Sequence, residues 1–272
     1  MARTAVPAVA GAAAGAAYLA GLLALDHYAN YHEQLALGVL TFAVLAGALS
    51  RVPLETRAQT IGVVCFATVG EVTGSLLWGV YHYRLHNLPL FVPPAHGLVY
   101  LTGFALARSL GAWPPGPRLV PGTVQCASHE GLVSTRQASA AHTRALVIAA
   151  AAFAGGWGLL GLIVLPRRDV AGAIGVPLLL LFLWRGRNRA IYAAVFLVVA
   201  SLELYGTAIG TWRWERELPG LGIPDGNPPS GVASGYVWFD VMALLVAPYL
   251  ATALMRARPS LRARQGYSTT QE

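Results

Sequence analysis

Long apolar runs separated by short polar segments dominate the chain. A helix needs about 20 mainly apolar residues to cross the hydrocarbon core of a bilayer. The pattern therefore predicts an all-α, polytopic integral membrane helix bundle of about eight transmembrane helices. The sixth run is short and carries Pro177, and the first has an alternative interpretation as a signal peptide. The predicted spans are residues 5–25, 34–50, 58–82, 92–110, 144–165, 170–185, 190–213 and 235–256.

Composition agrees with this class. The 272 residues are 56% hydrophobic and 11% charged, whereas a soluble domain is about a quarter charged. All 19 basic residues are arginines, and they lie in short clusters between apolar runs. Such clusters are typical of membrane topology rather than of a phosphate-binding face, so we expect contact with the bilayer and no nucleic acid. No P-loop or dinucleotide-binding glycine motif occurs, and we expect no nucleotide.

The arginines also predict the orientation. With the N-terminus inside, 14 of the 19 arginines fall on the inner side and five on the outer side. The positive-inside rule then predicts that both termini lie in the cytoplasm. We expect the membrane to be the bacterial plasma membrane. Residues 111–143, rich in Pro, Gly, Ser and Thr, are expected to be a cytoplasmic linker loop between the halves 1–110 and 144–256. Residues 257–272 are expected to be a polar cytoplasmic tail.

Two segments of the chain are similar to each other. Four spans in each half preserve the orientation, so the similarity predicts two parallel four-helix repeats, and such repeats commonly place the functional site between them. Chance matching of Gly and Pro is the alternative, which the shared order of the features disfavours. The matched features are Glu71 with Glu203, Gly74 with Gly206, Tyr81 and Tyr83 with Trp212 and Trp214, Pro93-Pro94 with Pro228-Pro229, and Tyr100 with Tyr236.

Three carboxyl groups fall within the predicted spans: Glu71, Glu203 and Asp240. On translocon scales a charged carboxylate at the bilayer centre costs roughly 2.5–3.5 kcal/mol, so such a group usually faces a cavity or a partner. An apolar interior favours the neutral form of a carboxyl group, and a neutral carboxyl can act as a general acid. We therefore predict these three residues to be catalytic. The structural alternative is a hydrogen bond that joins two helices.

Aromatic and polar residues near the acids are expected to line a substrate site. Tyr and Trp collect at membrane interfaces whatever a protein does, but here each aromatic pair is expected on the same helix as a Glu, roughly three turns above it. Ring faces stabilise cationic centres by about 0.5–2 kcal/mol. The predicted substrate-binding residues are Trp78, Tyr81, His96, Tyr100, Trp212, Trp214, Asn227 and Tyr236.

Metal and cofactor signals are weak throughout the sequence. No HxxxH, HExxH or HxxEH motif occurs, and Cys65 and Cys126 have no CxxC spacing. We therefore expect no metal and no cofactor. An aspartate-rich diphosphate motif is also lacking, which disfavours magnesium-dependent ionisation of a prenyl diphosphate.

The segment around Glu71 resembles a known family. The pattern formed by Glu71, Gly74, Gly79, Tyr81, Tyr83 and Pro93 is similar to that of the carotenoid-biosynthesis membrane family that includes bisanhydrobacterioruberin hydratase. The second segment, "ELYGTAIGTWRW", resembles the small integral-membrane lycopene cyclases. Both resemblances imply a membrane enzyme that protonates the end of a polyene and guides the resulting carbocation. They cover about a quarter of the chain.

These observations favour an integral-membrane enzyme that performs acid-catalysed alkene chemistry on an isoprenoid or carotenoid-like lipid. Hydration, cyclisation and isomerisation remain open, as does which Glu delivers the proton. An apolar, lipid-like substrate is the expected partner. One alternative is a small transporter or lipid-binding protein whose acids form a proton relay. Another is a structural membrane subunit whose acids pair with a partner protein.

Overall fold

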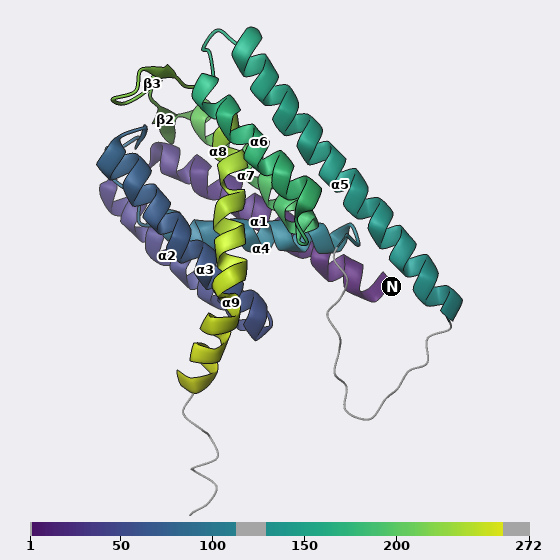
Figure 1. Cartoon of the computed structure of the whole chain (residues 1–272). Coiled ribbons are helices and arrows are strands. Elements are labelled where there is room, and N and C mark those ends of the chain that lie inside the picture. Colours follow the sequence, from purple (N-terminus) through teal and green to yellow (C-terminus); the bar gives the residue numbers. More distant parts are fainter. Residues whose placement is uncertain (1, 113–128, 258–272) are drawn as a thin grey trace, which may run out of the picture.

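The computed structural model describes residues 2–112 and 129–257, and these residues are mostly helical (Figure 1). The first half contains α1 (Ala2–Tyr28), α2 (Tyr31–Ser50), α3 (Leu54–Glu71), its π-helical extension η1 (Val72–Trp78) and α4 (Val92–Ser109). The second half contains α5 (His129–Ile163), α6 (Val170–Arg185), α7 (Arg189–Ile209), α8 (Ser230–Gly235) and α9 (Val237–Ala257).

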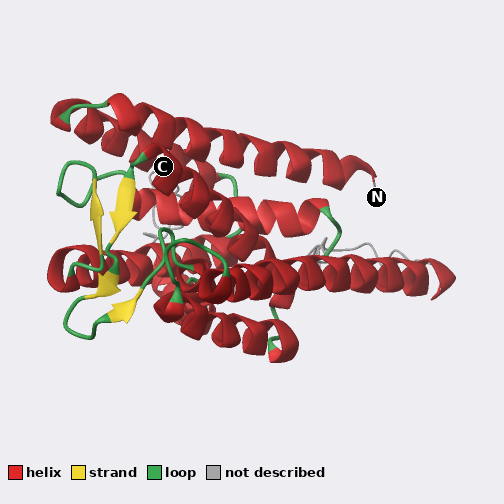
Figure 2. Ribbon diagram, turned by 90° about the horizontal axis from the view of Figure 1, so that it is seen from above, coloured by secondary structure: helices red, strands yellow, loops and turns green. Residues whose placement is uncertain are grey.

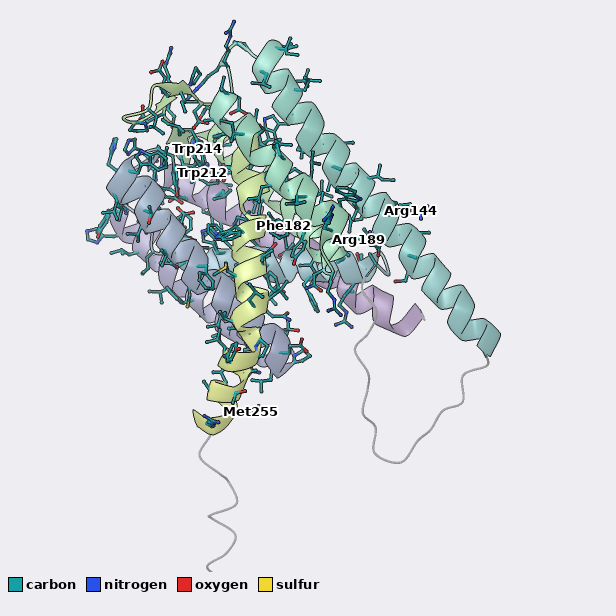
Figure 3. All side chains as sticks on the ribbon, in the orientation of Figure 1. Arg144, Phe182, Arg189, Trp212, Trp214 and Met255 are labelled. Atoms are coloured by element: carbon teal, nitrogen blue, oxygen red, sulfur yellow. The ribbon has the colours of Figure 1, made fainter. Side chains whose placement is uncertain are left out.

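Short strands gather at one end of the helices (Figure 2). Strand β1 (Tyr81–Tyr83) pairs antiparallel with β2 (Trp212–Trp214), which joins the two halves of the chain. Strand β3 (Glu217–Leu218) pairs with β4 (Ile223–Pro224) to form a local hairpin. Figure 3 places Trp212 and Trp214 at this strand end and Met255 near the opposite end of α9. The pairing of β1 with β2 therefore brings the two similar segments of the sequence together.

Six helices of the described residues are long and apolar enough to cross a membrane. Large apolar side chains on their surfaces face outward, among them Ile163, which is 72% exposed. These features indicate an integral membrane protein. The other two predicted spans, 92–110 and 170–185, correspond to α4 and α6 and are not among the six; α6 has only 16 residues. The count of eight spans stays a prediction.

Several predicted boundaries are wrong. The spans predicted at 58–82 and 190–213 end at Trp78 and Ile209, because a glycine in the left-handed conformation follows each helix. Both aromatic pairs consequently lie on strands, not three helical turns above a Glu. The predicted linker loop, 111–143, overlaps the start of α5, which begins at His129. Residues 113–128, including Cys126, and nearly all of the tail predicted at 257–272 lie outside the described residues.

Helix α7 occupies the centre of the described bundle. In the most apolar stretch of α7, 56% of the residues are buried inside the protein. The corresponding share in the other five candidate spans is 17–28%. Its side chains Ile191, Val195 and Phe196 are almost inaccessible and pack into the main core cluster. Helix α4 packs against α7, and α9 packs against α3. Each half thus contributes a helix to the packing of the other half.

Candidate active site

Glu71 lies where α3 widens into the π-helical segment η1. Gly79 ends η1 with a φ of 73°, and the chain then folds back so that β1 contacts η1. The hydroxyl groups of Tyr81 and Tyr83 both donate to Oε2 of Glu71, at 2.6 and 2.7 Å. The local fold therefore aims two donors at one carboxylate oxygen. Single π-helical turns inside helices are frequent at functional sites.

His96 holds the other oxygen of Glu71. It lies near the start of α4, just after Pro93-Pro94, where prolines are tolerated because the first helical N–H groups lack helical acceptors. Its Nε2 is 3.0 Å from Oε1 of Glu71, and its Nδ1 is 2.7 Å from the hydroxyl of Tyr236. Glu71 is thus connected to β1 and α4 directly, and to the junction of α8 and α9 through His96.

Glu203 has a similar setting near the end of α7. Gly210, with a φ of 79°, ends this helix and leads into β2. The indole Nε1 of Trp212 donates to Oε2 of Glu203 at 2.9 Å, and that of Trp214 donates to the same oxygen at 3.3 Å. Its other oxygen, Oε1, accepts no hydrogen bond from the described residues. Glu203 therefore keeps one oxygen available for a further partner.

The pairing of β1 with β2 places the donors of one carboxyl group beside those of the other. Tyr81 lies opposite Trp214, with ring centroids 4.4 Å apart, and Tyr83 lies opposite Trp212, with centroids 6.1 Å apart. Two glycines permit this arrangement. A Cβ at Gly74 would come within 2.9 Å of the Tyr81 ring, and one at Gly206 would overlap the ring of Trp212. The aromatic rings can lie over the helix ends only because these positions lack side chains.

Both carboxyl groups line one cavity of about 590 Å³. Its walls are largely apolar and aromatic, and they come from both halves of the chain. The polar groups that enter it include Glu71, Glu203, His96, Tyr81, Tyr83 and Tyr236. The strands that carry the donors of the two glutamates are paired, so both acids belong to the same end of the cavity. The cavity thus combines a hydrocarbon-like wall with two neighbouring acids.

The tyrosines of β1 remain neutral donors. Burial, followed by the charge of the Glu71 carboxylate, raises the pKa of both Tyr81 and Tyr83 above the ordinary value of 10.0. Neither phenol therefore ionises in the neutral pH range. Each keeps the proton that it donates to Glu71.

Most predicted site residues come together in this cavity. Its lining includes Glu71, Glu203, Trp78, Tyr81, His96, Trp212, Trp214 and Tyr236. The indole of Trp78 also donates to the backbone oxygen of Pro219 at 3.0 Å, which connects η1 to the loop of the second half.

Three predicted residues lie outside the cavity lining. Tyr100 is fully buried and donates to Oε1 of Gln59 at 3.0 Å. Asn227 accepts a hydrogen bond from the backbone N–H of Trp214 at 2.8 Å, so it orients β2. Asp240 is fully buried in α9. Of the three, Asn227 contacts the cavity lining through Trp214, whereas Tyr100 and Asp240 lie buried elsewhere in the core.

The predicted site list omitted several cavity residues, of which Tyr83 is chemically the most important. Phe91, Trp238 and Phe239 also line the cavity. The alternation Tyr-His-Tyr and Trp-Arg-Trp has the period of a β-strand, which places both outer members on one face. That pattern could have identified Tyr83 as the companion of Tyr81.

Among the described residues, no group of three or more His, Cys, Asp or Glu side chains is arranged to hold a metal ion. The comparisons with protein-family models, with curated proteins and with solved structures found no match.

Proposed function

We propose that the protein is an integral-membrane enzyme that performs acid-catalysed alkene chemistry on an isoprenoid or carotenoid-like lipid. The observation that carries this proposal is the placement of Glu71 and Glu203 in one apolar, aromatic-walled cavity. Its volume of about 590 Å³ falls in the range of roughly 300–1,000 Å³ that is usual for small-molecule sites. The family resemblance of the two Glu segments supports the same class of reaction.

Glu203 is the proton donor in this proposal. Its Oε2 is held by two indole groups, whereas Oε1 has no donor among the described residues and can carry a proton toward the substrate. Transfer of that proton forms a C–H bond at one alkene carbon and leaves a cation at the neighbouring carbon. The electron-rich faces of the surrounding aromatic rings stabilise such a cation.

Glu71 and His96 form the proton acceptor. Two phenol hydroxyls and an imidazole surround the Glu71 carboxylate, and hydrogen bonds of this kind favour the ionised form. In hydration, water adds to the cation and gives its proton to this pair. In isomerisation or cyclisation, the pair removes a proton from a carbon next to the cation. In each case the proton count of the enzyme is restored once the acceptor returns the proton to the donor.

The proposal includes two parallel four-helix repeats. The two halves have the same features in the same order. Each has a Glu, a Gly packed against an aromatic ring, a Gly with left-handed backbone and a short strand. The mutual packing of α3 with α9 and of α7 with α4 supports the same relationship. With an even number of spans, both termini lie in the cytoplasm. A reporter fused after Glu272 should therefore be active only in its cytoplasmic form.

The direct test compares lipids extracted from cells with and without the gene by mass spectrometry. A gain of one water identifies hydration, and a change of isomer without a change in mass identifies cyclisation or isomerisation. Glu203→Gln and Glu71→Gln should abolish the product, because an amide does not supply or accept the proton at neutral pH. Both variants should still insert into the membrane, since the amide is nearly isosteric and can hydrogen-bond to the same neighbours.

Asp26→Asn is a matched control. Asp26 is also fully buried in a candidate span, but it pairs with Gln34 outside the cavity. Product per folded protein should therefore stay near the wild-type value in this variant. Wild-type turnover in both glutamine variants would contradict the enzymatic proposal. A lipid that copurifies with the protein unchanged would instead identify lipid binding or transport.

A further inference from the structure

A second cavity, also of about 590 Å³, lies between α1, α2 and α4. It shares no lining residue with the cavity that holds Glu71 and Glu203. Its lining includes the exposed residues Gly11, Ala14 and Arg51, so it opens at the protein surface. The second cavity is therefore a separate, accessible site in the first half of the chain.

Contacts of glycines show how the three helices run past this cavity. Helices α2 and α4 run in the same direction, and α1 runs in the opposite direction. The contacts are Gly38 with Leu90 and Gly97 with Leu45 for α2 and α4, and Gly11 with Ala105 and Gly15 with Thr102 for α1 and α4. The ends of α2 and α4 therefore lie beside the start of α1. Strand β1 precedes the start of α4, so this end of the helices is opposite the paired strands.

Two arginines line the cavity at this end. Arg51 caps the end of α2, and Arg108 lies in the last turn of α4. Arg51 donates to the backbone oxygen of Gly47 at 3.3 Å, and the guanidinium of Arg108 lies 5.7 Å from the ring centroid of Phe104. Within the described part of the chain no carboxylate forms an ion pair with either arginine. Glu55, the acidic residue nearest to Arg51 in the sequence, does not line the cavity.

The remaining wall is apolar along its length. On α4 it extends from Leu98 to Arg108, about 15 Å at the rise of an α-helix. Its two hydroxyl groups are already engaged: that of Tyr18 lies 2.9 Å from Oγ1 of Thr41, and that of Thr102 donates to the backbone oxygen of Leu98 at 2.7 Å. The cavity thus combines a long apolar wall with two positive charges at one end.

We propose that this cavity binds an anionic phospholipid of the bilayer, with the phosphate on Arg51 and Arg108 and an acyl chain along the apolar wall. Arginine pairs with phosphate through charge-assisted hydrogen bonds. The expected topology puts both arginines on the cytoplasmic side, where anionic lipids are abundant and basic pockets between transmembrane helices bind their headgroups. A free phosphate would use only the arginines and leave the apolar wall empty. The site does not depend on the proposed reaction, because it lies outside the cavity of the two glutamates.

A purely structural role for the arginines gives a different expectation. A cation at the C-terminal end of a helix interacts favourably with the helix dipole and can bond the last carbonyl groups. Arg185 supplies the comparison. It lies in the last turn of α6 with its guanidinium 4.8 Å from the ring centroid of Trp184, but it lines neither cavity. If Arg51 and Arg108 only stabilise helix ends, their loss should change lipid binding no more than the loss of Arg185.

The test is native mass spectrometry of the full-length protein in detergent, titrated separately with dioleoyl-phosphatidylglycerol and dioleoyl-phosphatidylcholine. The two lipids have the same chains and differ in headgroup charge. The wild type should bind one phosphatidylglycerol about tenfold or more tightly than phosphatidylcholine, equivalent to ~1.4 kcal/mol. The double variant Arg51→Gln with Arg108→Gln should lose this preference. Arg185→Gln should retain it.

A matched pair of alanines tests the apolar wall. Ala48 lines the cavity, whereas Ala46, two residues earlier on α2, is exposed and does not. Ala48→Leu fills part of the space and should weaken binding of phosphatidylglycerol about tenfold, equivalent to ~1.4 kcal/mol. Ala46→Leu should leave the affinity unchanged. If the arginine variant does not fold, the comparison of the two lipids and the alanine pair still test the site.

Any of four results would overturn the lipid site. These are equal affinity of the wild type for both lipids, an unchanged preference in the double arginine variant, wild-type affinity in Ala48→Leu, and displacement of phosphatidylglycerol by an excess of inorganic phosphate. The last result would identify a simple anion site. No part of the measurement uses product formation, so the lipid site and the enzymatic proposal can fail independently of each other.

Discussion

The two Glu-bearing segments of the chain have the same local plan and different donors. In both, a Glu precedes a left-handed glycine and a three-residue strand, and two aromatic side chains of that strand donate back to one carboxyl oxygen. Glu71 receives hydroxyl groups at 2.6 and 2.7 Å and also faces His96. Glu203 receives indole groups at 2.9 and 3.3 Å and keeps one oxygen open. Similar backbones thus create one strongly held carboxylate and one more available carboxyl group.

The largest expected difference concerns the imidazole, which only the first segment has. His96→Phe removes the imidazole that we propose shares the proton with Glu71, and we expect product per folded protein to fall about 100-fold or more, as is usual on loss of a general acid or base. His82→Phe is the control, since His82 lies at the surface and pairs with Glu215 at 3.4 Å. Product formation is measured in cell lipid extracts. Equal activity of the two variants would remove His96 from the acceptor pair.

Double-mutant cycles compare how firmly each carboxyl group is held. One cycle combines Tyr83→Phe with Glu71→Leu, and the other combines Trp214→Phe with Glu203→Leu, because leucine accepts no hydrogen bond. Hydrogen bonds to charged groups contribute about 1.5–3 kcal/mol, so the first cycle should give a coupling in that range and the second less than about 1 kcal/mol. The cycle cancels the packing cost of replacing Trp by Phe. The measurement is the free energy of unfolding in detergent, and a larger coupling at Glu203 would reverse the comparison.

The glycines beneath the aromatic rings should differ as well. Gly206→Ala forces a methyl group into the Trp212 ring, whereas Gly74→Ala meets only the edge of Tyr81 at 2.9 Å. Overpacking typically costs about 1–3 kcal/mol, and we expect the upper part of this range for Gly206→Ala and the lower part for Gly74→Ala. Gly155→Ala is the control, because a Cβ there meets nothing within 4 Å. Thermal midpoints in detergent measure the effect, and equal losses at Gly74 and Gly206 would contradict it.

The smallest effect is expected in the longer loop of the second segment. Burial, followed by the negative charge of Asp169, raises the pKa of Asp225 from 3.8 to about 7. Between these values the unfolded chain has lost the proton that the native protein keeps, so native stability should fall as the pH rises through this window. Asp225→Asn should weaken this dependence, so its thermal midpoint relative to wild type should be higher at about pH 8 than at about pH 5. The same offset at both pH values would show that Asp225 does not cause it.

Hydrophobic pattern alone predicted the helical membrane class, because apolar runs of this length have few other uses. The ordered match of Glu, Gly, aromatic and Pro positions in the two segments also predicted that Glu71, Glu203 and their aromatic neighbours correspond. The direction of those aromatic side chains was not predictable in the same way. A three-residue alternation such as Tyr-His-Tyr fits a strand, but so short a pattern at the end of an apolar run does not exclude a longer helix. Gly79 and Gly210 end the helices through their left-handed backbone.

The separation of Asp240 from the cavity could not be predicted either. Asp240 and Tyr236 are four residues apart and share one side of the helix, which suggested a common site. In the structure the side chain of Tyr236 reaches His96, whereas that of Asp240 is fully buried and does not line the cavity. Which of two neighbours on one helical face reaches a cavity depends on the packing of the other helices, and a single sequence does not contain that information.

The pairing of β1 with β2 also bears on ancestry. Its register is centred on the pair His82 and Arg213. A half turn about that point carries the pair Tyr81–Trp214 onto the pair formed by Trp212 and Tyr83. Contacts of this symmetry arise when two identical subunits meet through the same surface. A homodimer built in that way must present identical donors to both of its acids. Fusion of two such genes into one removes this constraint, because each half then mutates independently. Tyrosines at one acid and tryptophans at the other are the outcome that independent mutation permits, and under the proposed function they would allow a pair of equal carboxyl groups to become a donor and an acceptor.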